Sequence, residues 1–526
     1  MNKQIIIPVR LSVPPKTKAQ MKKMIWILLM TAAADIHAAD VASTNSPATN
    51  APPVKNDAAT IPDATHKPVF TTNTVTIAGQ RVRYVAETGM LPILKPDGTT
   101  RASVFYIAYT RLDETNTSAR PVTFCFNGGP GSSSVWLHLG GLGPRRVKMN
   151  PDGTLPPPPF VLVDNDYSIL NASDLVFIDP VATGFSRAAK DEKSDQFFGD
   201  SADLDSVGEF IRLWTTRHER WLSPKFLCGE SYGVFRAAGL ADHLRSRYGM
   251  YLNGLMLVSG VLDFATLWNN AGNDLPYPLS LPAYTATAQF HGKLPADLQN
   301  DLPKALAEAR KFAQGEYTVA LQQGNALPAD ERKKITAGLV RLTGLTPQVI
   351  SDNNLRVDQG VFRKQLLHDK GLILGAYDAR ITGRDNNPAA SSPDFDPSAA
   401  ATLGPFSAAM NSYVRGELKF EDDLPYEIIA GVQPWNYGVR NSYASAGEKL
   451  ATTMNQNPFM RVLVLGGQRD LVCPLDTMRY ALGHMPLDAA YRTNISYAEF
   501  DSGHMMYINL PDLKKMQKDL ENFLTK

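Results

Sequence analysis

The chain has 526 residues, and its 53 Lys and Arg nearly balance its 52 Asp and Glu, which leaves a formal net charge of +1. Apolar residues make up 44% of the chain, which is typical of folded globular proteins and excludes a mainly disordered one. The near-zero charge argues against a nucleic-acid partner, because such proteins need a basic surface that neutralises phosphates. No HExxH or paired CxxC spacing is present, so we expect neither a metal nor another cofactor.

Residues 1–38 have the pattern of a secretory signal. Lys22 and Lys23 precede an apolar run over residues 24–34, and small residues follow as far as Ala38. The run is shorter than the roughly 20 residues of a membrane-spanning helix, so we expect no membrane anchor. The sequence therefore predicts an exported protein, periplasmic or secreted.

Two further segments follow the signal. Residues 39–68 are rich in Ala, Pro, Thr and Asn without periodicity, and they predict a flexible leader. Residues 69–526 are expected to form the folded domain. Met21, directly before the two lysines, is an alternative start of the protein.

Short apolar runs alternate with helical patterns along the folded domain. Alternation of apolar and polar residues predicts two antiparallel strands within 73–87 and a third within 102–112. Six apolar runs predict further strands at 122–127, 174–179, 225–230, 255–260, 461–467 and 495–500. Helical patterns lie between several of these runs, for example over 201–222. The order predicts an α/β fold with a mostly parallel central sheet and helices on both faces.

The interval 264–455 interrupts this alternation. It contains helical patterns at 296–314 and 329–342 with polar loops between them. An insertion of this size between two strands predicts a cap lobe, and such lobes usually shape a substrate pocket.

A serine on a predicted strand-to-helix turn is the candidate nucleophile. Residues 228–233 read CGESYG, which places Ser231 in a GxSxG motif directly after the apolar run 225–230. On such a turn the glycines relieve steric crowding, and the helix amino terminus favours developing negative charge. A plain tight turn uses the same residues, so the motif alone does not establish a nucleophile.

The partners of such a serine must come from other segments. Asp470 follows the predicted strand 461–467 and His504 follows 495–500, so both lie at carboxyl ends of strands, where sites of open α/β sheets form. The chain order Ser, Asp, His is that of α/β-hydrolase triads. Rivals are His484, Asp476 and Asp501; the first two lie in a helical pattern, where a surface histidine is the ordinary interpretation.

A glycine-rich segment follows another strand. Residues 127–134 read NGGPGSSS, directly after the apolar run 122–127. Glycines let the backbone approach a ligand, and their N–H groups can face an oxyanion. A tight Gly-Pro turn is the alternative interpretation.

Taken together, these motifs resemble the serine carboxypeptidase family over residues 70–526. The shared motifs, in the family's order, are NGGPGSSS, LGP (142–144), VFIDPVATGFS (176–186), GESYG (229–233), Asp470 with Cys473, and GHM (503–505). The resemblance implies an α/β-hydrolase fold and a carboxypeptidase that acts on peptides with a free carboxy terminus.

The resemblance also implies a role for particular residues. Ser231 would be the nucleophile, His504 the general base and Asp470 its orienter. The oxyanion would bind to the backbone N–H groups of Gly129 and Tyr232. The terminal carboxylate of the substrate would bind to Asn127 and Glu230.

Several positions depart from the family pattern. Cys125 stands where the family usually has Trp, and Gly141 where eukaryotic members have Glu. Ser132 replaces a half-cystine, and Tyr507 replaces the Pro of the usual GHMVP end. We therefore expect carboxylate recognition to rest on fewer groups.

The three cysteines fall into two classes. Cys125 and Cys228 lie in predicted buried strands and are expected to be small core residues. Cys473 follows Asp470 closely, and either an inert packed thiol or a reactive one fits its position.

Two other functions fit the same residues. An esterase or acyltransferase would use the same triad, because water or another nucleophile can resolve the acyl-enzyme. A non-catalytic exported binding protein would keep the fold without turnover. The intact Ser, Asp and His favour the enzyme.

Overall fold

The computed structural model describes residues 67–114 and 116–526. The predicted signal and residues 39–66 of the predicted leader lie outside the described residues. Within the described ranges, no helix combines the length and the apolar character needed to cross a membrane.

The strands follow the apolar runs of the sequence. In chain order they are β1 (Val69–Ile77), β2 (Gln80–Leu94), β3 (Thr100–Arg111), β4 (Val122–Phe126), β5 (Arg145–Val147), β6 (Leu162–Asp164), β7 (Asp174–Ile178), β8 (Arg187–Ala188), β9 (Lys225–Glu230), β10 (Gly254–Val258), β11 (Leu372–Leu374), β12 (Thr382–Arg384), β13 (Arg461–Gly467) and β14 (Ile495–Phe500). All of the strands that the sequence predicts are therefore present.

The helices lie between these strands, and the longest unbroken series, α4–α10, lies between β10 and β11. In chain order they are α1 (Val135–Leu137), α2 (Asp200–Arg217), α3 (Tyr232–Tyr248), α4 (Pro276–Phe290), α5 (Ala296–Gln299), α6 (Leu302–Phe312), α7 (Thr318–Gln323), α8 (Ala329–Thr343), α9 (Pro347–Asp352), α10 (Gln359–Gln365), α11 (Pro397–Gly416), α12 (Gly447–Gln456), α13 (Leu475–Gly483) and α14 (Leu510–Thr525).

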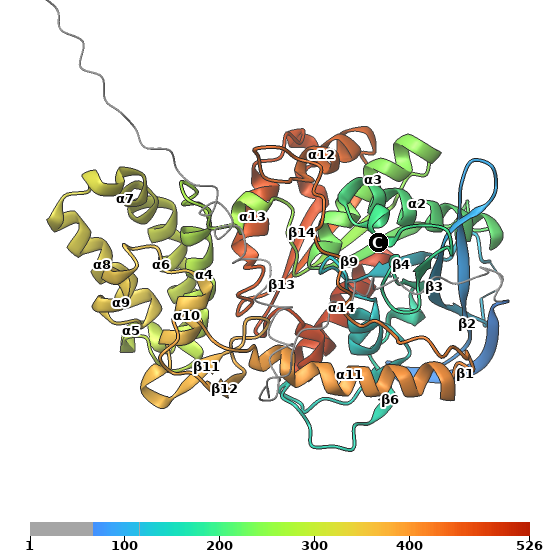
Figure 1. Cartoon of the computed structure of the whole chain (residues 1–526), viewed down its shortest axis with the longest axis horizontal. Coiled ribbons are helices and arrows are strands. Elements are labelled where there is room, and N and C mark those ends of the chain that lie inside the picture. Colours follow the sequence, from blue (N-terminus) through green and yellow to red (C-terminus); the bar gives the residue numbers. More distant parts are fainter. Residues whose placement is uncertain (1–66, 115) are drawn as a thin grey trace, which may run out of the picture. The chain divides into compact units, whose positions relative to one another are not determined.

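In the described part of the chain, ten strands form one sheet with the order β1-β2-β3-β7-β4-β9-β10-β13-β14, and β8 pairs with β3 (Figure 1). The strands from β7 to β14 along this order run parallel, whereas β1, β2 and β3 pair antiparallel at one edge. The prediction of an α/β-hydrolase fold with a mostly parallel sheet is confirmed.

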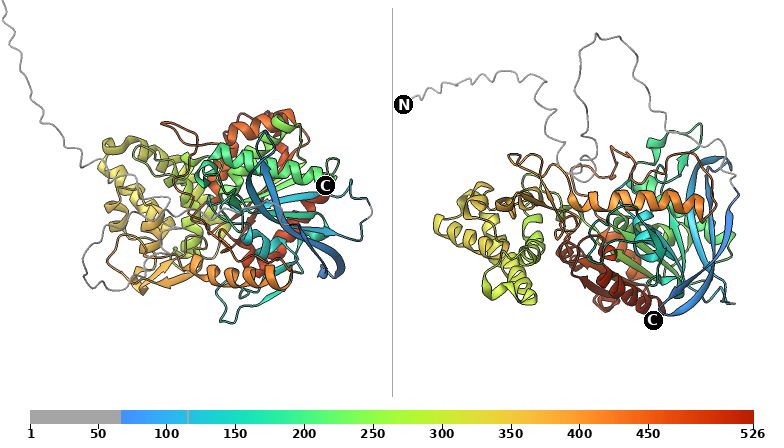
Figure 2. Two further views of the ribbon diagram at one scale, coloured as in Figure 1. Left: turned by 45° about the vertical axis from the view of Figure 1, so that its right-hand side comes forward. Right: turned by 90° about the horizontal axis from the view of Figure 1, so that it is seen from below.

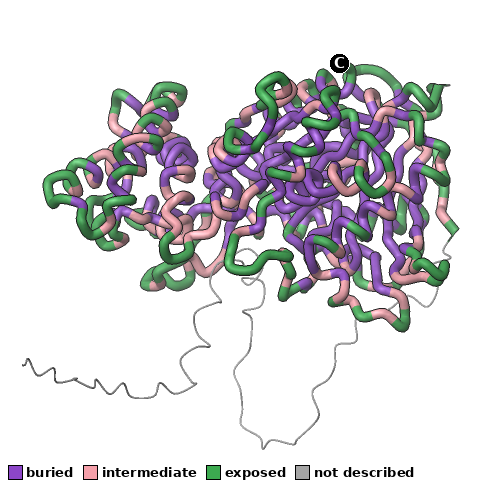
Figure 3. Tube along the Cα trace, turned by 90° about the horizontal axis from the view of Figure 1, so that it is seen from above, coloured by how far each residue is buried: buried purple, intermediate pink, exposed green. Residues whose placement is uncertain are grey.

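Both faces of the sheet are covered, as the unbroken apolar runs require. Phe124 and Phe126 of β4 pack in a hydrophobic cluster with α2, α3 and α12. Cys125 faces the other way and packs with residues of α11 and α14. Buried residues, purple in Figure 3, gather in the interior, and the long helix α11, orange in Figure 2, belongs to the second cluster.

The segment between β10 and β13 divides into two kinds of packing. Helices α4–α10 share a hydrophobic cluster that is separate from both faces of the sheet, and Leu471 of the sheet domain joins it. Helices α11 and α12 instead pack in the two clusters of the sheet. The cap lobe stays a prediction, and this packing indicates that α4–α10 would form its core.

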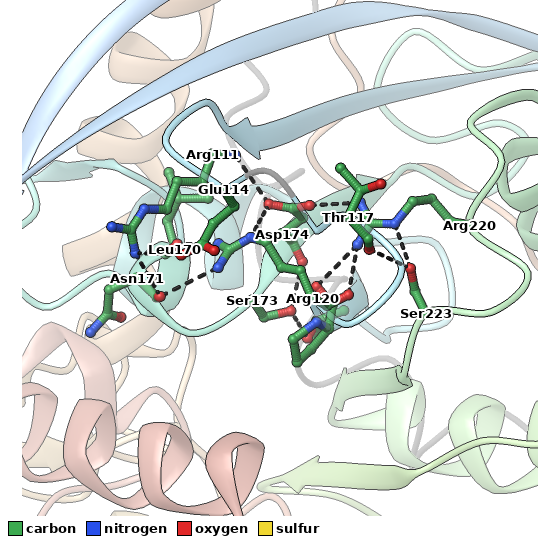
Figure 4. Close-up of polar contacts among 12 residues, drawn as sticks. Arg111, Glu114, Thr117, Arg120, Leu170, Asn171, Ser173, Asp174, Arg220 and Ser223 are labelled. Carbon is green, nitrogen blue, oxygen red and sulfur yellow. Dashed lines mark hydrogen bonds and ion pairs between the residues drawn. The ribbon is translucent and has the colours of Figure 1, made fainter.

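A buried ion cluster joins the amino ends of β4 and β7 (Figure 4). Asp174 Oδ1 accepts a hydrogen bond of 2.7 Å from Arg120 Nε, and Oδ2 accepts one of 2.6 Å from Arg220 Nη1. All three side chains are buried. Because this cluster lies at the amino ends of the strands, it fixes the sheet at the end opposite to Ser231.

Candidate active site

Ser231 occupies a strained turn between β9 and α3. Its φ of 60° and ψ of −128° belong to a region that residues other than glycine rarely adopt. A Cβ atom on Gly229 would lie 2.1 Å from the carbonyl oxygen of Gly233, so the turn needs glycine there. Glu230 and Tyr232 on either side are buried, whereas Ser231 is partly exposed. Strain of this kind is often kept at functional sites, where it presents one side chain.

Asp470 and His504 meet at the carboxyl ends of β13 and β14. His504 Nδ1 lies 2.7 Å from Asp470 Oδ2. The other carboxylate oxygen of Asp470 accepts backbone N–H bonds of 2.8 Å from Val472 and 2.9 Å from Cys473. Asp470 is fully buried and His504 is 2% exposed. The carboxylate is thus held rigidly and can orient the imidazole.

The environment of His504 favours its protonated form. Burial alone would lower the pKa of the imidazole, but the charge and hydrogen bond of Asp470 outweigh it, and Glu230 adds to them. The pKa of His504 is therefore raised above its usual value. A base with a raised pKa accepts a proton readily, provided that it starts neutral.

The rival residues lie in other environments. His484 is exposed at the end of α13, where its ring stacks on Tyr480 and its Nδ1 lies 2.7 Å from the carbonyl oxygen of Tyr480. Asp476 forms an ion pair of 2.8 Å with Arg310 of α6. The side chain of Asp501 is 79% exposed. None of the three lies in a geometry that resembles a triad.

The predicted oxyanion groups come from two segments in close contact. A Cβ atom on Gly128 would lie 2.4 Å from the backbone nitrogen of Tyr232, so the glycine-rich segment lies directly against the start of α3. Gly129 has a φ of +101°, a conformation that side chains disfavour. The glycine-rich segment therefore lies beside the turn that carries Ser231, and the oxyanion role of Gly129 and Tyr232 stays a prediction.

The predicted carboxylate-binding residues contact each other directly. Asn127 Nδ2 donates a hydrogen bond of 2.9 Å to Glu230 Oε2, and Tyr507 Oη donates one of 2.6 Å to the same oxygen. Asn127 Oδ1 accepts the N–H of Leu137 at 3.1 Å, which turns its amide nitrogen toward Glu230. Tyr507 thus adds a donor to Glu230, whereas the expectation that fewer groups bind the substrate carboxylate stays a prediction.

Glu230 is a buried carboxyl group with an unusual proton affinity. Burial raises its pKa to about 7, although the His504 charge and the donors Tyr507 and Asn127 each act to lower it. The group is therefore largely protonated below neutral pH. A neutral carboxyl can donate a hydrogen bond to another carboxylate.

All three cysteines, each within the described residues, are free thiols. Cys125 and Cys228 are fully buried in neighbouring strands, as predicted. Cys473 is buried beside the hydroxyl of Ser231, with which it interacts through its thiol. Burial raises the pKa of Cys473 well above its usual value, and Asp470 and Glu230 raise it further. This environment favours the thiol over the reactive thiolate.

Sequence reasoning missed the contacts that two residues of this site make. Tyr507 was visible only as a departure from GHMVP. Tyr377, from the segment between β10 and β13, accepts the backbone N–H of His504 and places its ring 5.2 Å from the imidazole, centroid to centroid. No pattern around residue 377 predicts this contact.

Comparison with known families agrees with the arrangement. Residues 80–507 match the serine carboxypeptidase family. The chain belongs to this family. The resemblance that the motifs indicated is therefore confirmed.

Individual relatives within the family match only in part. Serine carboxypeptidase-like 16 of Arabidopsis thaliana is 28% identical over 187 residues, which cover 34% of this chain and 40% of the relative. Serine carboxypeptidase-like 15 of the same plant is 31% identical over 132 residues, which cover 24% of this chain and 28% of the relative. The matches thus span less than half the length of these serine carboxypeptidase relatives.

The fold itself is similar to a solved structure of a prohormone-processing carboxypeptidase from Saccharomyces cerevisiae. The TM-score is 0.51 at 15% identity, and the match covers 84% of this chain and 91% of the yeast chain. At this identity the likeness supports the serine carboxypeptidase fold and says nothing further about substrates.

Proposed function

We propose that the protein is a serine-type carboxypeptidase that releases carboxy-terminal residues from peptides. The observation that carries the proposal is Glu230, a buried carboxyl group adjacent to Ser231 and largely protonated below pH 7. Such a group can bind the free carboxylate of a peptide next to the nucleophile. An esterase would have no use for this second carboxyl group.

The proposed reaction begins with acylation of Ser231. Asp470 accepts the Nδ1–H of His504, which leaves Nε2 as the proton acceptor. As the Ser231 oxygen bonds to the scissile carbonyl carbon, its proton moves to His504 Nε2. The backbone N–H groups of Gly129 and Tyr232 would stabilise the negative charge on the former carbonyl oxygen.

The two remaining steps return the enzyme to its starting state. The imidazolium of His504 gives its proton to the nitrogen of the terminal residue while the C–N bond breaks. Water then attacks the acyl carbon, its proton moves to His504, and the Ser231 oxygen leaves with that proton. The products are a shortened peptide and a free amino acid.

Recognition of the terminal carboxylate rests on Glu230 and Asn127. Two ionised carboxylates would repel each other, so Glu230 must hold a proton to bind the substrate. Its pKa of about 7 allows this at neutral and lower pH. Peptides with a free carboxy terminus are therefore the proposed substrates.

We also propose that the protein is exported to the periplasm or secreted. The proposal rests on the basic, apolar and small-residue pattern of residues 1–38. Amino-terminal sequencing of the protein from cell fractions tests it. Recovery of a chain that still carries residues 24–34 in the cytosol would contradict export.

The proposed activity is tested with matched blocked dipeptides, one with a free carboxy terminus and one amidated. A carboxypeptidase should have the higher kcat/KM for the free acid at pH 6, by about tenfold or more, since only the free acid has a carboxylate that the protonated Glu230 can bind. Turnover of simple esters with equal rates for acid and amide would favour the esterase. Failure of a fluorophosphonate to label Ser231 would favour a binding protein.

A further inference from the structure

Both donors that reach Glu230 end on the same carboxyl oxygen. Tyr507 Oη and Asn127 Nδ2 lie 2.6 Å and 2.9 Å from Oε2. No hydrogen bond from the described residues reaches Oε1. A carbonyl oxygen has two lone pairs, so these two donors fill the acceptor capacity of Oε2.

The space for Tyr507 is made by two glycines. A Cβ atom on Gly140 would lie 2.4 Å from the Tyr507 ring, and one on Gly141 would lie 2.8 Å from the Tyr507 Cβ. Any side chain at either position would therefore displace the ring. Tyr507 is 1% exposed, so its hydroxyl is fixed by packing as well as by its bond to Glu230.

We infer that Tyr507 is a positioning residue that decides which oxygen of Glu230 carries the proton. With Oε2 filled by two donors, the proton of neutral Glu230 must lie on Oε1, the oxygen left for the terminal carboxylate of the substrate. Tyr507 thus fixes the Oε1–H of neutral Glu230 as the hydrogen-bond donor to the substrate carboxylate. This inference rests on the proposed carboxypeptidase function.

Other titratable groups also face Glu230 and enter its proton balance. His504 and Asp470 act on it from the loops after β14 and β13. Tyr377, Cys473 and Tyr507 have Glu230 among the charges that raise their own pKa values. Of these groups, only Tyr507 donates a hydrogen bond to Glu230, so removal of its hydroxyl is a selective change.

The direction in which Tyr507→Phe shifts the pKa of Glu230 follows from the charge on the accepting carboxyl group. A donor to a carboxyl oxygen stabilises the ionised form more than the neutral one, and Tyr507 accordingly acts to lower the pKa of Glu230. Tyr507→Phe should therefore raise this pKa by about one unit, which corresponds to a tenfold higher proton affinity. It should also let the protonated oxygen rotate away from the substrate.

The experiment measures KM against pH for the free-acid and amidated dipeptides in wild type and Tyr507→Phe. At pH 5.5, the ratio of the acid KM to the amide KM should rise about tenfold in the variant. The pH at which the acid KM begins to rise should move upward by about one unit. A merely structural loss would change both substrates alike and leave that pH unchanged.

The control is Tyr413→Phe. Tyr413 is also buried, at 2% exposure, and its hydroxyl contacts Tyr109 rather than Glu230. Tyr413→Phe therefore removes a phenolic oxygen from a buried position, as Tyr507→Phe does, without changing a contact of Glu230. The ratio of the two KM values and its pH dependence should match wild type in this control.

An infrared measurement separates this inference from the proposed activity. The carboxyl stretch of Glu230, assigned by its loss in Glu230→Gln, is followed against pH without substrate. A midpoint that is higher by about one unit in Tyr507→Phe supports the inference even if no peptide is cleaved. An unchanged midpoint together with an unchanged KM ratio overturns it, whereas cleavage of the free-acid peptide by wild type would leave the carboxypeptidase proposal intact.

Discussion

The backbone N–H of His504 donates a hydrogen bond of 2.5 Å to the carbonyl oxygen of Tyr377, a residue of the segment inserted between β10 and β13. Residues 376–377, called here the strap, also contact the loop of Asp470, because the Leu471 N–H donates to the Ala376 carbonyl oxygen at 3.1 Å. Asp396 in turn accepts the Ala376 N–H at 3.1 Å. The inserted segment thus braces both loops, the one that carries the candidate base His504 and the one that carries its orienter Asp470.

This bracing predicts that Asp396→Ala lowers turnover, although Asp396 itself is not expected to contact the substrate. Loss of its backbone and cap bonds should lower the free energy of unfolding by about 1–3 kcal/mol and kcat by roughly three- to tenfold, since a loosened strap lets His504 shift. The control is Asp358→Ala, which removes another helix cap from the insertion, a bond of 2.8 Å to the Val361 N–H. Equal kcat losses in the two variants would contradict a specific role for the strap.

Ser231→Ala should abolish turnover and leave the fold unchanged. A triad acts as a unit, and loss of its nucleophile typically costs about 10⁶-fold in kcat. Circular dichroism and thermal melting check the fold, and dipeptide hydrolysis checks the activity. Appreciable hydrolysis by a folded Ser231→Ala protein would place the chemistry at another residue.

The two histidines should differ sharply. His504→Ala should lose nearly as much activity as the serine variant, whereas His484→Ala, at an exposed helix end, should lose less than about twofold.

Asp470→Asn should reduce kcat by roughly 10⁴-fold, because the amide no longer holds the required imidazole tautomer. A loss below tenfold in Asp470→Asn would contradict its role as the orienting residue.

The pH dependence of binding should follow Glu230. Above its pKa of about 7 the carboxyl ionises and repels the terminal carboxylate, so the KM of free-acid peptides should rise with pH, about tenfold per unit at the limit. Below that pH the proton is present and binding is retained. Amidated peptides should lack this rise, and Glu230→Gln, a permanent donor, should flatten it for the free acid. Parallel KM profiles for acid and amide in wild type would exclude carboxylate recognition by Glu230.

The ion cluster at the far end of the sheet should act on stability alone. Asp174→Asn removes the charge that neutralises Arg120 and Arg220, both buried, and should lower the free energy of unfolding by about 3–5 kcal/mol. Asp164→Asn, which breaks a partly exposed pair with Arg145, should cost less than about 1 kcal/mol. Urea unfolding measures the free energy of unfolding of both variants. Similar losses in the two would show that burial of the ion cluster adds little to stability.

Local patterns in the sequence were sufficient for much of the fold. Unbroken apolar runs mark strands that are buried on both faces, so β4, β7, β9, β10 and β13 could be predicted from hydropathy. The edge strand β14 is partly exposed, and its apolar residues alternate with polar ones. The GxSxG turn is equally local, because its glycines and strained serine lie within five consecutive residues. Since parallel strands align their carboxyl ends, the loops with Asp470 and His504 could be expected near Ser231.

The contacts that tune the candidate site were decided by tertiary structure. Tyr507 reaches Glu230 across 277 positions of the chain, into space left by two glycines on a third segment. Tyr377 reaches His504 through its backbone carbonyl, a group that every residue carries and that no sequence pattern can distinguish. The sequence by itself determined the family and predicted which groups would carry the chemistry, because their side-chain types and local turns are written in short motifs. Only the folded chain decided their proton affinity and orientation, because burial and the direction of a hydrogen bond depend on segments that are distant in sequence.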